Sequence, residues 1–426
     1  MRQSQLFTKT RREDPKDETA KNAKLLIRGG YIHKEMAGVY DYLPLGLMVL
    51  KKIEAIIREE MNALGAQELL LTSLQNPALW EASGRFDDKQ VDNWFKTHLH
   101  NGENFHAGSE LGLANTHEEP LAAMLVNHLH SYRDLPIYAY QFQTKFRNEL
   151  RAKSGIMRGR EFLMKDLYSF SRTEEDFRDF YEQCAEAYLR IFARVGLGEV
   201  TFRTFASGGS FGDFSDEFQT LSTAGEDIIY LDRERGLAIN KEIYNDDILK
   251  RLAFDKEKLA EVKAIEVGNI FPLGTRFAEA LNLHFIDEDG TKRFPLMGSY
   301  GIGLGRLLGT IVEVLSRDDG ICWPVAVAPF AVHLVTLPGA TEVRGLADDL
   351  YQQLTKQGLA VLYDDRPVGA GEKLTDSDLL GLPYRIIVSD RTLAANQLEV
   401  RVNADQKTEA VAPDKLVAFL DSKQQK

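Results

Sequence analysis

Cysteine is almost absent from this chain of 426 residues, which contains only Cys184 and Cys322. Two cysteines form neither a disulfide framework nor a CxxC metal site, so a reducing compartment is expected. Long apolar runs are also missing, and no stretch approaches the roughly 20 residues needed to cross a bilayer. The charged N-terminal residues lack the apolar segment of a secretory signal. The sequence therefore predicts a cytoplasmic protein without a membrane partner.

An excess of positive charge is lacking as well. Lys and Arg number 52 against 64 Asp and Glu, which gives a formal net charge of -12. This balance disfavours a protein that coats DNA, or any nucleic acid, without sequence preference. One local exception lies between residues 141 and 166, where seven basic residues accompany three acidic ones. This basic window is a candidate anion site, although charge runs more often form a solvated face.

Several common catalytic motifs are missing too. The chain has no GxxxxGK[ST] sequence, and the glycines at 301, 303 and 305 do not match the G-x-G-x-x-G of dinucleotide-binding folds. The sequence THEE at 116–119 is not the HExxH of a zinc protease. No serine–histidine–acid or thiol–histidine set stands out. We therefore expect no metal site built by the protein itself.

What is present is a mixture of strand and helix patterns in two parts. Apolar residues recur at helical spacing in 45–64, 119–130, 173–195 and 304–316, and strands are expected at 137–146, 162–171, 264–271, 281–286 and 294–300. Many strands with few crossover helices indicate an α+β fold with an antiparallel sheet. Residues 206–226 are expected to form a loop or turn cluster, and 241–264 are charged and helix-prone.

The order of the expected strands and helices changes after the prolines at 324 and 329. Strand and helix patterns then alternate to the end of the chain, which is typical of a small α/β domain. The sequence thus predicts one domain over residues 1–325 and a second over 330–426.

The basic window is interpreted as strand, loop and returning strand. If Arg147 and Glu149 belong to the first strand, they project from one face, because residues two apart in a strand point the same way. Arginine suits phosphate, and a carboxylate beside it could accept from an adenine amino group or bind a metal. Phe162 on the returning strand could stack on a base. The alternatives are a surface ion pair and a core phenylalanine.

Two further clusters add to this chemistry. Arg306 follows the glycine motif at the start of a helix, where a cation opposes the helix dipole unless an anion offsets it. The alternative is a tight turn with a surface arginine. Thr116 and Glu118 could hold an ammonium group, whereas Thr116 with Glu119 could equally form a capping box. Together the clusters suggest nucleotide chemistry on a carboxylate substrate that carries an amino group.

These motifs resemble those of class II aminoacyl-tRNA synthetases, and most closely those of bacterial-type prolyl-tRNA synthetases. The resemblance covers nearly the whole chain and is carried by GVYDYLPLGLMVLKKIEAIIREEMNALGAQELLL (38–71), LWEASGR (79–85), THEEP (116–120), QTKFRNELRAKSGIMRGREFLMKDLYSF (143–170), EVGNIFPLGTRF (266–277), GSYGIGLGR (298–306), WPVAVAPF (323–330) and LYDDRPVGAGEKLTDSDLLGLPYRIIV (362–388). It implies ATP-dependent ligation of L-proline to tRNA(Pro) through a prolyl-adenylate. It also implies Mg²⁺ carried with ATP, a homodimer, and a class II antiparallel sheet flanked by helices, followed by an α/β anticodon-binding domain.

The resemblance also implies roles for particular residues. Arg147 and Arg306 would be catalytic. The ATP-binding residues would be Arg147, Glu149, Arg160, Phe162, Gly303 and Arg306. The proline-binding residues would be Thr116, Glu118, Arg147, Ser210 and Phe218. The anticodon-binding residues would be Asp364, Asp365, Arg366, Lys373 and Asp376.

The chain departs from the family pattern at several places. Thr72 stands where motif 1 has a proline, and Asp216 and Asn269 replace usual histidines. Many bacterial-type members insert an editing domain of well over a hundred residues between the catalytic motifs. Here only 18 residues, 247–264, occupy that place, which is too few for a separate domain. The sequence therefore predicts an enzyme without an editing domain of its own.

Other functions remain open at this point. Threonyl- or seryl-tRNA synthetases share the later motifs, and the THEEP segment with residues 206–218 favours proline. A noncatalytic paralogue is disfavoured because Arg147, Glu149 and Arg306 are all retained. A simple tRNA-binding module is also disfavoured, since residues 331–426 contain 11 basic and 14 acidic residues.

Overall fold

The computed structural model describes residues 1–100, 105–150, 154–208 and 214–424. They form two compact units. The larger unit comprises Met36–Val39 and Glu54–Thr310, and the smaller unit comprises Met1–Glu35, Tyr40–Ile53 and Ile311–Lys426. Two long helices, α2 (Pro44–Ala63) and α8 (Leu304–Leu315), contribute residues to both units.

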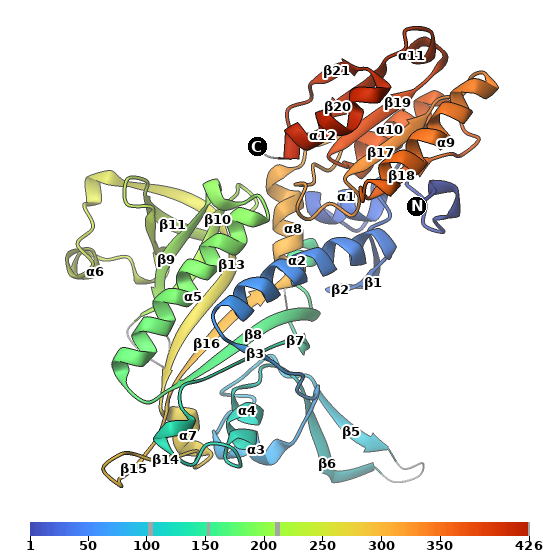
Figure 1. Ribbon diagram of the computed structural model, residues 1–426. Helices are drawn as coiled ribbons and strands as arrows, with labels where there is room; N and C mark the ends of the chain where they lie inside the picture. The colour runs from blue at the N-terminus through green and yellow to red at the C-terminus, as the bar shows by residue number, and fades with distance from the viewer. Residues whose placement is uncertain (101–104, 151–153, 209–213, 425–426) are drawn as a thin grey trace. The chain divides into compact units, whose positions relative to one another are not determined.

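The larger unit is built on a nine-stranded sheet (Figure 1). Its strands, in spatial order, are β10 (Phe214–Leu221), β9 (Thr201–Ser207), β12 (Leu237–Asn240), β11 (Asp227–Asp232), β13 (Leu259–Gly274), β16 (Leu296–Gly303), β8 (Glu161–Ser171), β7 (Ile137–Phe146) and β3 (Gln67–Glu68). The pairings are antiparallel except for β12 with β9 and β3 with β7. The long strand β13 pairs with both β11 and β10. The predicted antiparallel sheet is confirmed.

One face of this sheet is covered by α5 (Glu174–Arg194), the green helix in Figure 1. The helix begins with a capping box, in which Thr173 and Asp176 satisfy each other's backbone groups. Its apolar residues recur at helical spacing and are buried, so the amphipathic pattern seen in the sequence is the one that packs. Gly268 of β13 lies beneath this helix, and a Cβ there would come within 3.1 Å of Tyr188.

The opposite face carries short helices near one end of the sheet. These are α3 (Pro77–Ala82), α4 (Glu118–Leu125) and α7 (Arg276–Ala280). Leu121, Leu125 and Phe277 pack there against Phe170 and Met297 of the sheet. The smaller strands β4 (Leu74–Gln75), β5 (Lys96–His100) and β6 (Phe105–Leu113) form a three-stranded sheet beside them, and β14 (Phe285–Ile286) pairs with β15 (Lys292–Arg293).

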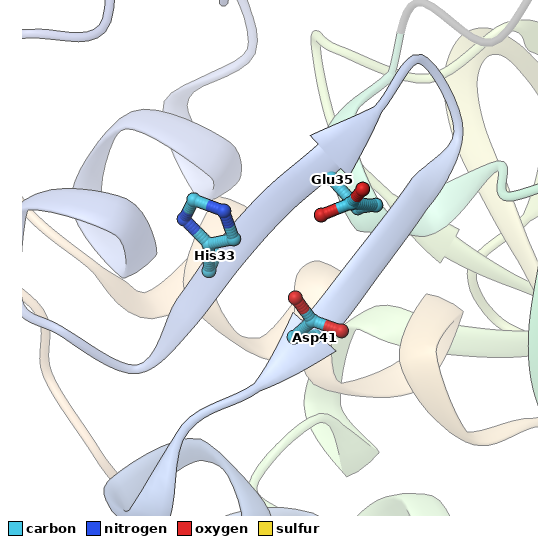
Figure 2. A group of neighbouring side chains, drawn as sticks. All are labelled: His33, Glu35 and Asp41. Carbon is cyan, nitrogen blue, oxygen red and sulfur yellow. The ribbon is translucent and has the colours of Figure 1, made fainter.

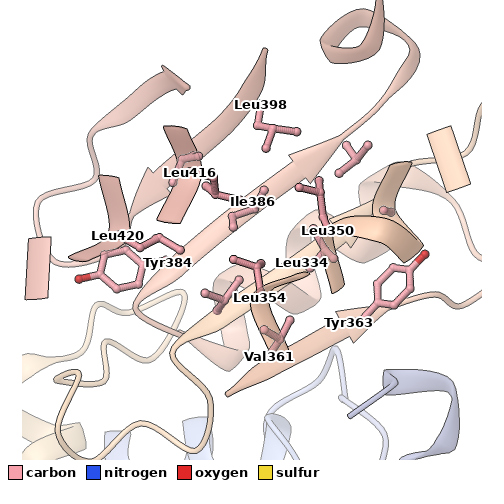
Figure 3. Close-up of a cluster of buried hydrophobic side chains, with 14 of the residues drawn as sticks. Leu334, Leu350, Leu354, Val361, Tyr363, Tyr384, Ile386, Leu398, Leu416 and Leu420 are labelled. Carbon is pink, nitrogen blue, oxygen red and sulfur yellow. The ribbon is translucent and has the colours of Figure 1, made fainter. Parts of the chain in front are cut away.

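The smaller unit contains a five-stranded sheet in the order β18 (Val361–Asp364), β17 (Val332–Thr336), β19 (Tyr384–Val388), β20 (Leu398–Val402) and β21 (Thr408–Val411). Its helices are α1 (Lys21–Arg28), α9 (Thr341–Lys356), α10 (Ala370–Leu380), α11 (Asp390–Ala394) and α12 (Leu416–Gln424). Figure 3 shows Leu334, Ile386 and Leu350 meeting in its core. The first three strands are parallel, so the predicted alternation of strands and helices is confirmed.

Some predicted elements differ from the structure. Residues 206–226, expected as a loop or turn cluster, include the whole of β10, whose buried Ser215, Gln219 and Thr220 hide the apolar alternation of a strand. The helix-prone segment 241–264 contains the short helix α6 (Asp246–Arg251), 3₁₀ turns at Lys241–Ile243 and Lys256–Lys258, and the beginning of β13. The strand expected at 281–286 is reduced to β14. Within the described part of the chain, none of the helices has the length and apolar character needed to cross a bilayer.

Candidate active site

A cavity of about 610 Å³ lies on the sheet face opposite α5. Alternation along β16 defines that face, because Tyr300 packs against Phe180 of α5 whereas Gly301 and Gly303 point the other way. Gly301 forms part of its floor. A Cβ at that residue would lie 2.4 Å from Met164 and 2.9 Å from Asn269, so a side chain would fill the space between them. The glycine motif thus provides a flat surface for a ligand.

Two arginines line this cavity from different elements. Arg306, in the first turn of α8, donates from Nη1 to Glu266 Oε2 at 2.9 Å and from Nε to the carbonyl of Met157 at 3.0 Å. Arg147 follows β7 and donates from Nε to the carbonyl of Asn115 at 3.3 Å. Burial lowers the pKa of Arg147, and the nearby charge of Arg306 lowers it further. Two cations that repel each other across one cavity favour an anion between them.

Glu149 lines the same cavity, but by a different geometry from the one expected. Strand β7 ends at Phe146, and the backbone N–H of Glu149 donates to the carbonyl of Arg147 at 2.7 Å, so the chain turns there. The prediction that both residues share one strand face is therefore wrong. The Glu149 carboxylate accepts from Arg158 Nε at 2.9 Å, and its carbonyl accepts from Arg160 Nε at 3.2 Å.

Five predicted ATP-binding residues come together around this space, namely Arg147, Glu149, Phe162, Gly303 and Arg306. The guanidinium carbon of Arg147 lies 5.6 Å from the centre of the Phe162 ring. The aromatic ring therefore lies beside a cation. Arg160 contacts the cavity through the backbone of Glu149 rather than as a lining side chain.

The candidate ammonium site lies at the start of α4. Thr116 Oγ1 donates to Glu118 Oε2 at 2.6 Å, and Ser299 Oγ of β16 lies 3.5 Å from Glu118 Oε1. The capping-box alternative is wrong, because the N-cap residue is His117 and no side chain caps the helix. Both Thr116 and Glu118 are buried, so their polar groups are held away from bulk water.

A buried polar network supports this pair from below. Tyr168 OH lies 3.3 Å from Thr116 Oγ1, accepts from the backbone N–H of His117 at 3.1 Å and donates to Asp166 Oδ2 at 3.1 Å. Lys145 Nζ donates to Asp166 Oδ1 at 2.7 Å and lies 2.8 Å from His117 Nδ1. The basic window was predicted to bind a ligand through its cations, but Lys145 belongs to this interior network.

His117 is neutral in this setting. Burial lowers its pKa to about 4, and the charge of Lys145 acts in the same direction. With Nδ1 accepting from Lys145, Nε2 carries the proton and donates to the carbonyl of Thr72 at 3.1 Å. The residue that replaces the motif 1 proline is thus tied by its backbone to the network under the ammonium site.

Phe218, another predicted proline-binding residue, lies away from the cavity. Phe218 is fully buried on the α5 face, with its ring 5.0 Å from that of Tyr188, so the structure does not bring it to the cavity. Ser210 lies outside the described residues. Asp216 also faces α5, where it accepts from Tyr181 OH at 2.8 Å and from Arg203 Nε at 2.9 Å. Its substitution for histidine therefore alters the packing of α5 rather than the cavity wall.

Glu217 and Asn269 are cross-strand neighbours on the cavity side. Asn269 Nδ2 donates to Glu266 Oε1 at 2.7 Å, which holds the carboxylate that Arg306 also contacts. Burial raises the pKa of Glu217 to about 8, and the charge of Glu266 contributes. The sequence assigned no role to Glu217 or Glu266, although Glu266 begins the segment 266–277 that carries the resemblance. The pairing of β10 with β13 brings them together.

The predicted anticodon-binding residues lie in the smaller unit and mostly pair with one another. Asp364 accepts from Arg366 Nη2 at 2.7 Å, and Arg366 Nη1 lies 2.8 Å from Asp376. Lys373 donates to the carbonyls of Thr336 and Asp364. Asp365 accepts from Ser4 Oγ at 2.9 Å. A neighbouring cavity of about 840 Å³ is lined by Arg344, Tyr363, Asp365, Arg366 and Lys373, among others.

One other group of side chains resembles a set of metal ligands. His33, Glu35 and Asp41 lie together on the hairpin of β1 (Ile32–Met36) and β2 (Val39–Tyr42), as Figure 2 shows. All three are exposed, and exposed acidic groups commonly cluster without an ion. The sequence assigned a role to none of these three residues.

Comparisons with known proteins agree with the two-part organisation. Residues 99–315 match the family model of the tRNA synthetase class II core domain (G, H, P, S and T), and residues 325–423 match that of the anticodon binding domain. Among solved structures, prolyl-tRNA synthetase from Cryptosporidium parvum complexed with halofuginone and AMPPNP aligns over 95% of this chain and 77% of its own, with a TM-score of 0.78 and 16% identity. That likeness concerns the fold.

Sequence relatives carry the identification further. The proline–tRNA ligase of Rhodopseudomonas palustris strain BisA53 is 39% identical, with 99% of this chain and 100% of the relative covered. The proline–tRNA ligase of Nitrobacter winogradskyi is 36% identical over the same shares of the two chains. The full-length match, with both domains in place, shows that the chain belongs to the prolyl-tRNA synthetase family, the proline–tRNA ligases.

Proposed function

We propose that this chain ligates L-proline to tRNA(Pro) through a prolyl-adenylate and releases AMP and diphosphate. One arrangement carries the proposal. Arg147 lines the cavity, where burial lowers the pKa of its guanidinium and the charge of Glu118 partly opposes that effect. An amino acid is a zwitterion, so its carboxylate can bind Arg147 while its ring nitrogen binds Glu118 and Thr116. The carboxylate is thereby directed toward the cavity that would hold ATP.

The first step then needs orientation and charge neutralisation. A proline carboxylate is ionised at neutral pH, so its oxygen attacks the α-phosphorus without a general base. The bond from the α-phosphorus to the bridging oxygen breaks, and diphosphate leaves with that oxygen. Arg147 stabilises the charge that builds on the α-phosphate, and Arg306 holds the outer phosphates. Phe162 and Glu149 bind the adenine.

Mg²⁺ fits the outer part of this site. Glu266 and Asp227 line the cavity that adjoins Arg306 and Arg158, and carboxylate oxygens are the ligands that Mg²⁺ takes together with phosphates. When bound with ATP, the ion supplies further positive charge to the leaving diphosphate. In the second step a terminal ribose hydroxyl of tRNA attacks the prolyl carbonyl, and AMP leaves.

The proposal extends to the setting of the enzyme. The smaller unit binds the tRNA anticodon near Asp364, Asp365, Arg366, Lys373 and Asp376. The enzyme acts in the cytoplasm as a homodimer.

The test is ATP–diphosphate exchange with each of the twenty amino acids in turn. We expect exchange that depends on proline. Exchange with threonine or serine but not with proline would refute the assignment of proline as the substrate. No exchange with any amino acid would favour a noncatalytic paralogue.

A further inference from the structure

Glu118 has a third partner, Arg85, which the motifs left without a role. Arg85 Nη1 lies 3.4 Å from Glu118 Oε2. The same nitrogen lies 3.1 Å and 3.3 Å from the two carboxylate oxygens of Glu119. Ser83 Oγ donates to Glu119 Oε1 at 2.7 Å, which fixes that carboxylate from the side of α3. One guanidinium therefore bridges two consecutive acids, of which Glu118 belongs to the candidate proline site.

Arg85 is itself held in place on several sides. Its guanidinium carbon lies 5.0 Å from the centre of the Trp80 ring and 5.2 Å from that of Phe277. Its carbonyl accepts from the indole N–H of Trp94 at 3.0 Å. A planar cation that contacts two rings and two acids has little remaining rotational freedom. The carboxylate that it contacts is therefore held in one orientation.

The contacts of Glu118 distinguish its two oxygens. Oε2 contacts both Thr116 Oγ1 and Arg85 Nη1, whereas Oε1 has the weak contact with Ser299 Oγ at 3.5 Å. Ser299 lies on β16, two residues before Gly301 of the cavity floor. Oε1 is thus the oxygen available to a substrate nitrogen on that side. Because Nη1 lies closer to Glu119 than to Glu118, Arg85 orients Glu118 without forming a tight ion pair with it.

We propose that Arg85, anchored on Glu119, is a positioning residue that turns Oε1 of Glu118 toward the ring nitrogen of proline. This inference rests on the proposed function. Loss of the guanidinium frees the Glu118 carboxylate to rotate, and it also leaves buried Glu119 without its cation. Proline binding then weakens, whereas ATP binding does not, since Arg85 lies outside the cavity that Arg147 and Arg306 line.

The experiment measures KM for proline, KM for ATP and kcat by diphosphate exchange in matched variants. In Arg85→Met, which keeps the length of the side chain, we expect KM for proline to rise about tenfold or more, with KM for ATP within about twofold. Arg85→Lys retains the cation and should recover part of the loss. Glu119→Gln keeps the shape but removes the anchoring charge, so Arg85 shifts toward Glu118 and KM for proline rises by a smaller factor.

Arg172 provides the matched control. It also bridges two consecutive acids, Asp287 and Glu288, and lies 4.7 Å from an aromatic ring centre, but its contacts are outside the cavity. Arg172→Met should leave all three kinetic constants unchanged. If Arg85→Met does not fold, Glu119→Gln carries the test.

Three results overturn the inference. They are an unchanged KM for proline in folded variants, a fall in that KM, or an equal change in both KM values. If Arg85 had a purely structural role, each variant would contain less active enzyme. KM for proline would then not change relative to KM for ATP. If the wild-type chain shows no proline-dependent exchange, the proposed function itself fails, and this outcome is distinct from a wild-type enzyme whose Arg85 variants bind proline normally.

Discussion

Lys145 Nζ lies 2.7 Å from Oδ1 of Asp166, and only 1% and 4% of the two side chains are exposed. Burial lowers the pKa of Lys145, whereas Asp166 raises it, so the two charges depend on each other. His117, Tyr168 and Gln141 occupy further positions around the pair. An ion pair of this kind costs free energy to bury and becomes strongly destabilising once one partner is removed.

The first prediction follows from this pair. Asp166→Asn should lower the free energy of unfolding by about 3 kcal/mol, because it leaves a buried lysine without its counter-ion. Chemical denaturation would measure the change. As a control, Glu234→Gln breaks the exposed pair with Lys258 and should leave the unfolding curve in place. Equal stability of Asp166→Asn and wild type would mean that Lys145 is neutral in the folded protein.

Arg147→Ala should nearly abolish adenylate formation while the fold is retained. The variant lacks a charge-assisted donor to the α-phosphate, and one such donor contributes roughly 3–4 kcal/mol to transition-state stabilisation. Proline-dependent exchange measures the loss, and circular dichroism checks the fold. Arg178→Ala, on the exposed side of α5, serves as the control. Near-normal exchange in Arg147→Ala would show that this residue does not stabilise the transition state.

The stability of the smaller unit should depend on pH through His333. Burial lowers the pKa of His333 to about 4, below the value of 6.5 of a free histidine. Between these two pH values the unfolded chain binds more protons than the folded one. The free energy of unfolding should therefore fall as the solution is acidified, by up to about 1.4 kcal/mol per pH unit for this group.

His333→Gln removes that dependence. Denaturation at about pH 7, 6 and 5 should give a shallower decrease for the variant than for wild type. His117, whose pKa is also lowered to about 4, still contributes to the slope of both proteins. If the free energy of unfolding fell equally steeply with pH in both proteins, His333 would take up its proton without unfolding of the protein.

The sequence predicted those parts of the fold in which one pattern is decisive. Helix α5 has strict helical spacing and a capping box, and β7 has the boundaries expected from its apolar residues. Strand β10 was missed because its cavity side consists of polar residues such as Glu217 and Gln219. Gln219 donates to Asp227 of β11, and Glu217 accepts from Asn240 of β12, and a single sequence does not reveal these partners.

The same limit applies to the site. Arg147, Phe162 and Arg306 were found from their residue types and motifs, and the structure places them around one cavity. Arg85 and Asp166 were not found, because each acts on a neighbour that is distant in the sequence. Phe218 was assigned by motif alone, and the side of a strand on which a residue lies depends on register that the motif does not encode.

Residues at the proposed anticodon site, together with Arg344 of the neighbouring cavity, should separate into two classes. Asp364 is fully buried and paired, so Asp364→Asn should destabilise the smaller unit as well as weaken tRNA charging. Arg344 is exposed at the cavity of this unit, so Arg344→Ala should raise KM for tRNA about tenfold while proline-dependent exchange is unchanged. Exposed Arg391, on α11, is the control. A parallel loss of exchange in Arg344→Ala would contradict the separation of the two functions.

The final prediction concerns errors in amino acid choice. A pocket that fits proline also admits smaller amino acids, because excluding a missing methylene contributes only about 1–3 kcal/mol. Alanine should therefore be activated at a low but measurable rate. The segment in which other bacterial-type members insert an editing domain contains here α6, a 3₁₀ turn at Lys256–Lys258 and the first residues of β13. The purified enzyme should form alanyl-tRNA(Pro) and leave it intact, so that any correction requires another protein.

The measurement follows pre-formed alanyl-tRNA(Pro) with the enzyme alone, with spontaneous hydrolysis as the control. Deacylation well above the spontaneous rate would reveal a hydrolytic site within this chain.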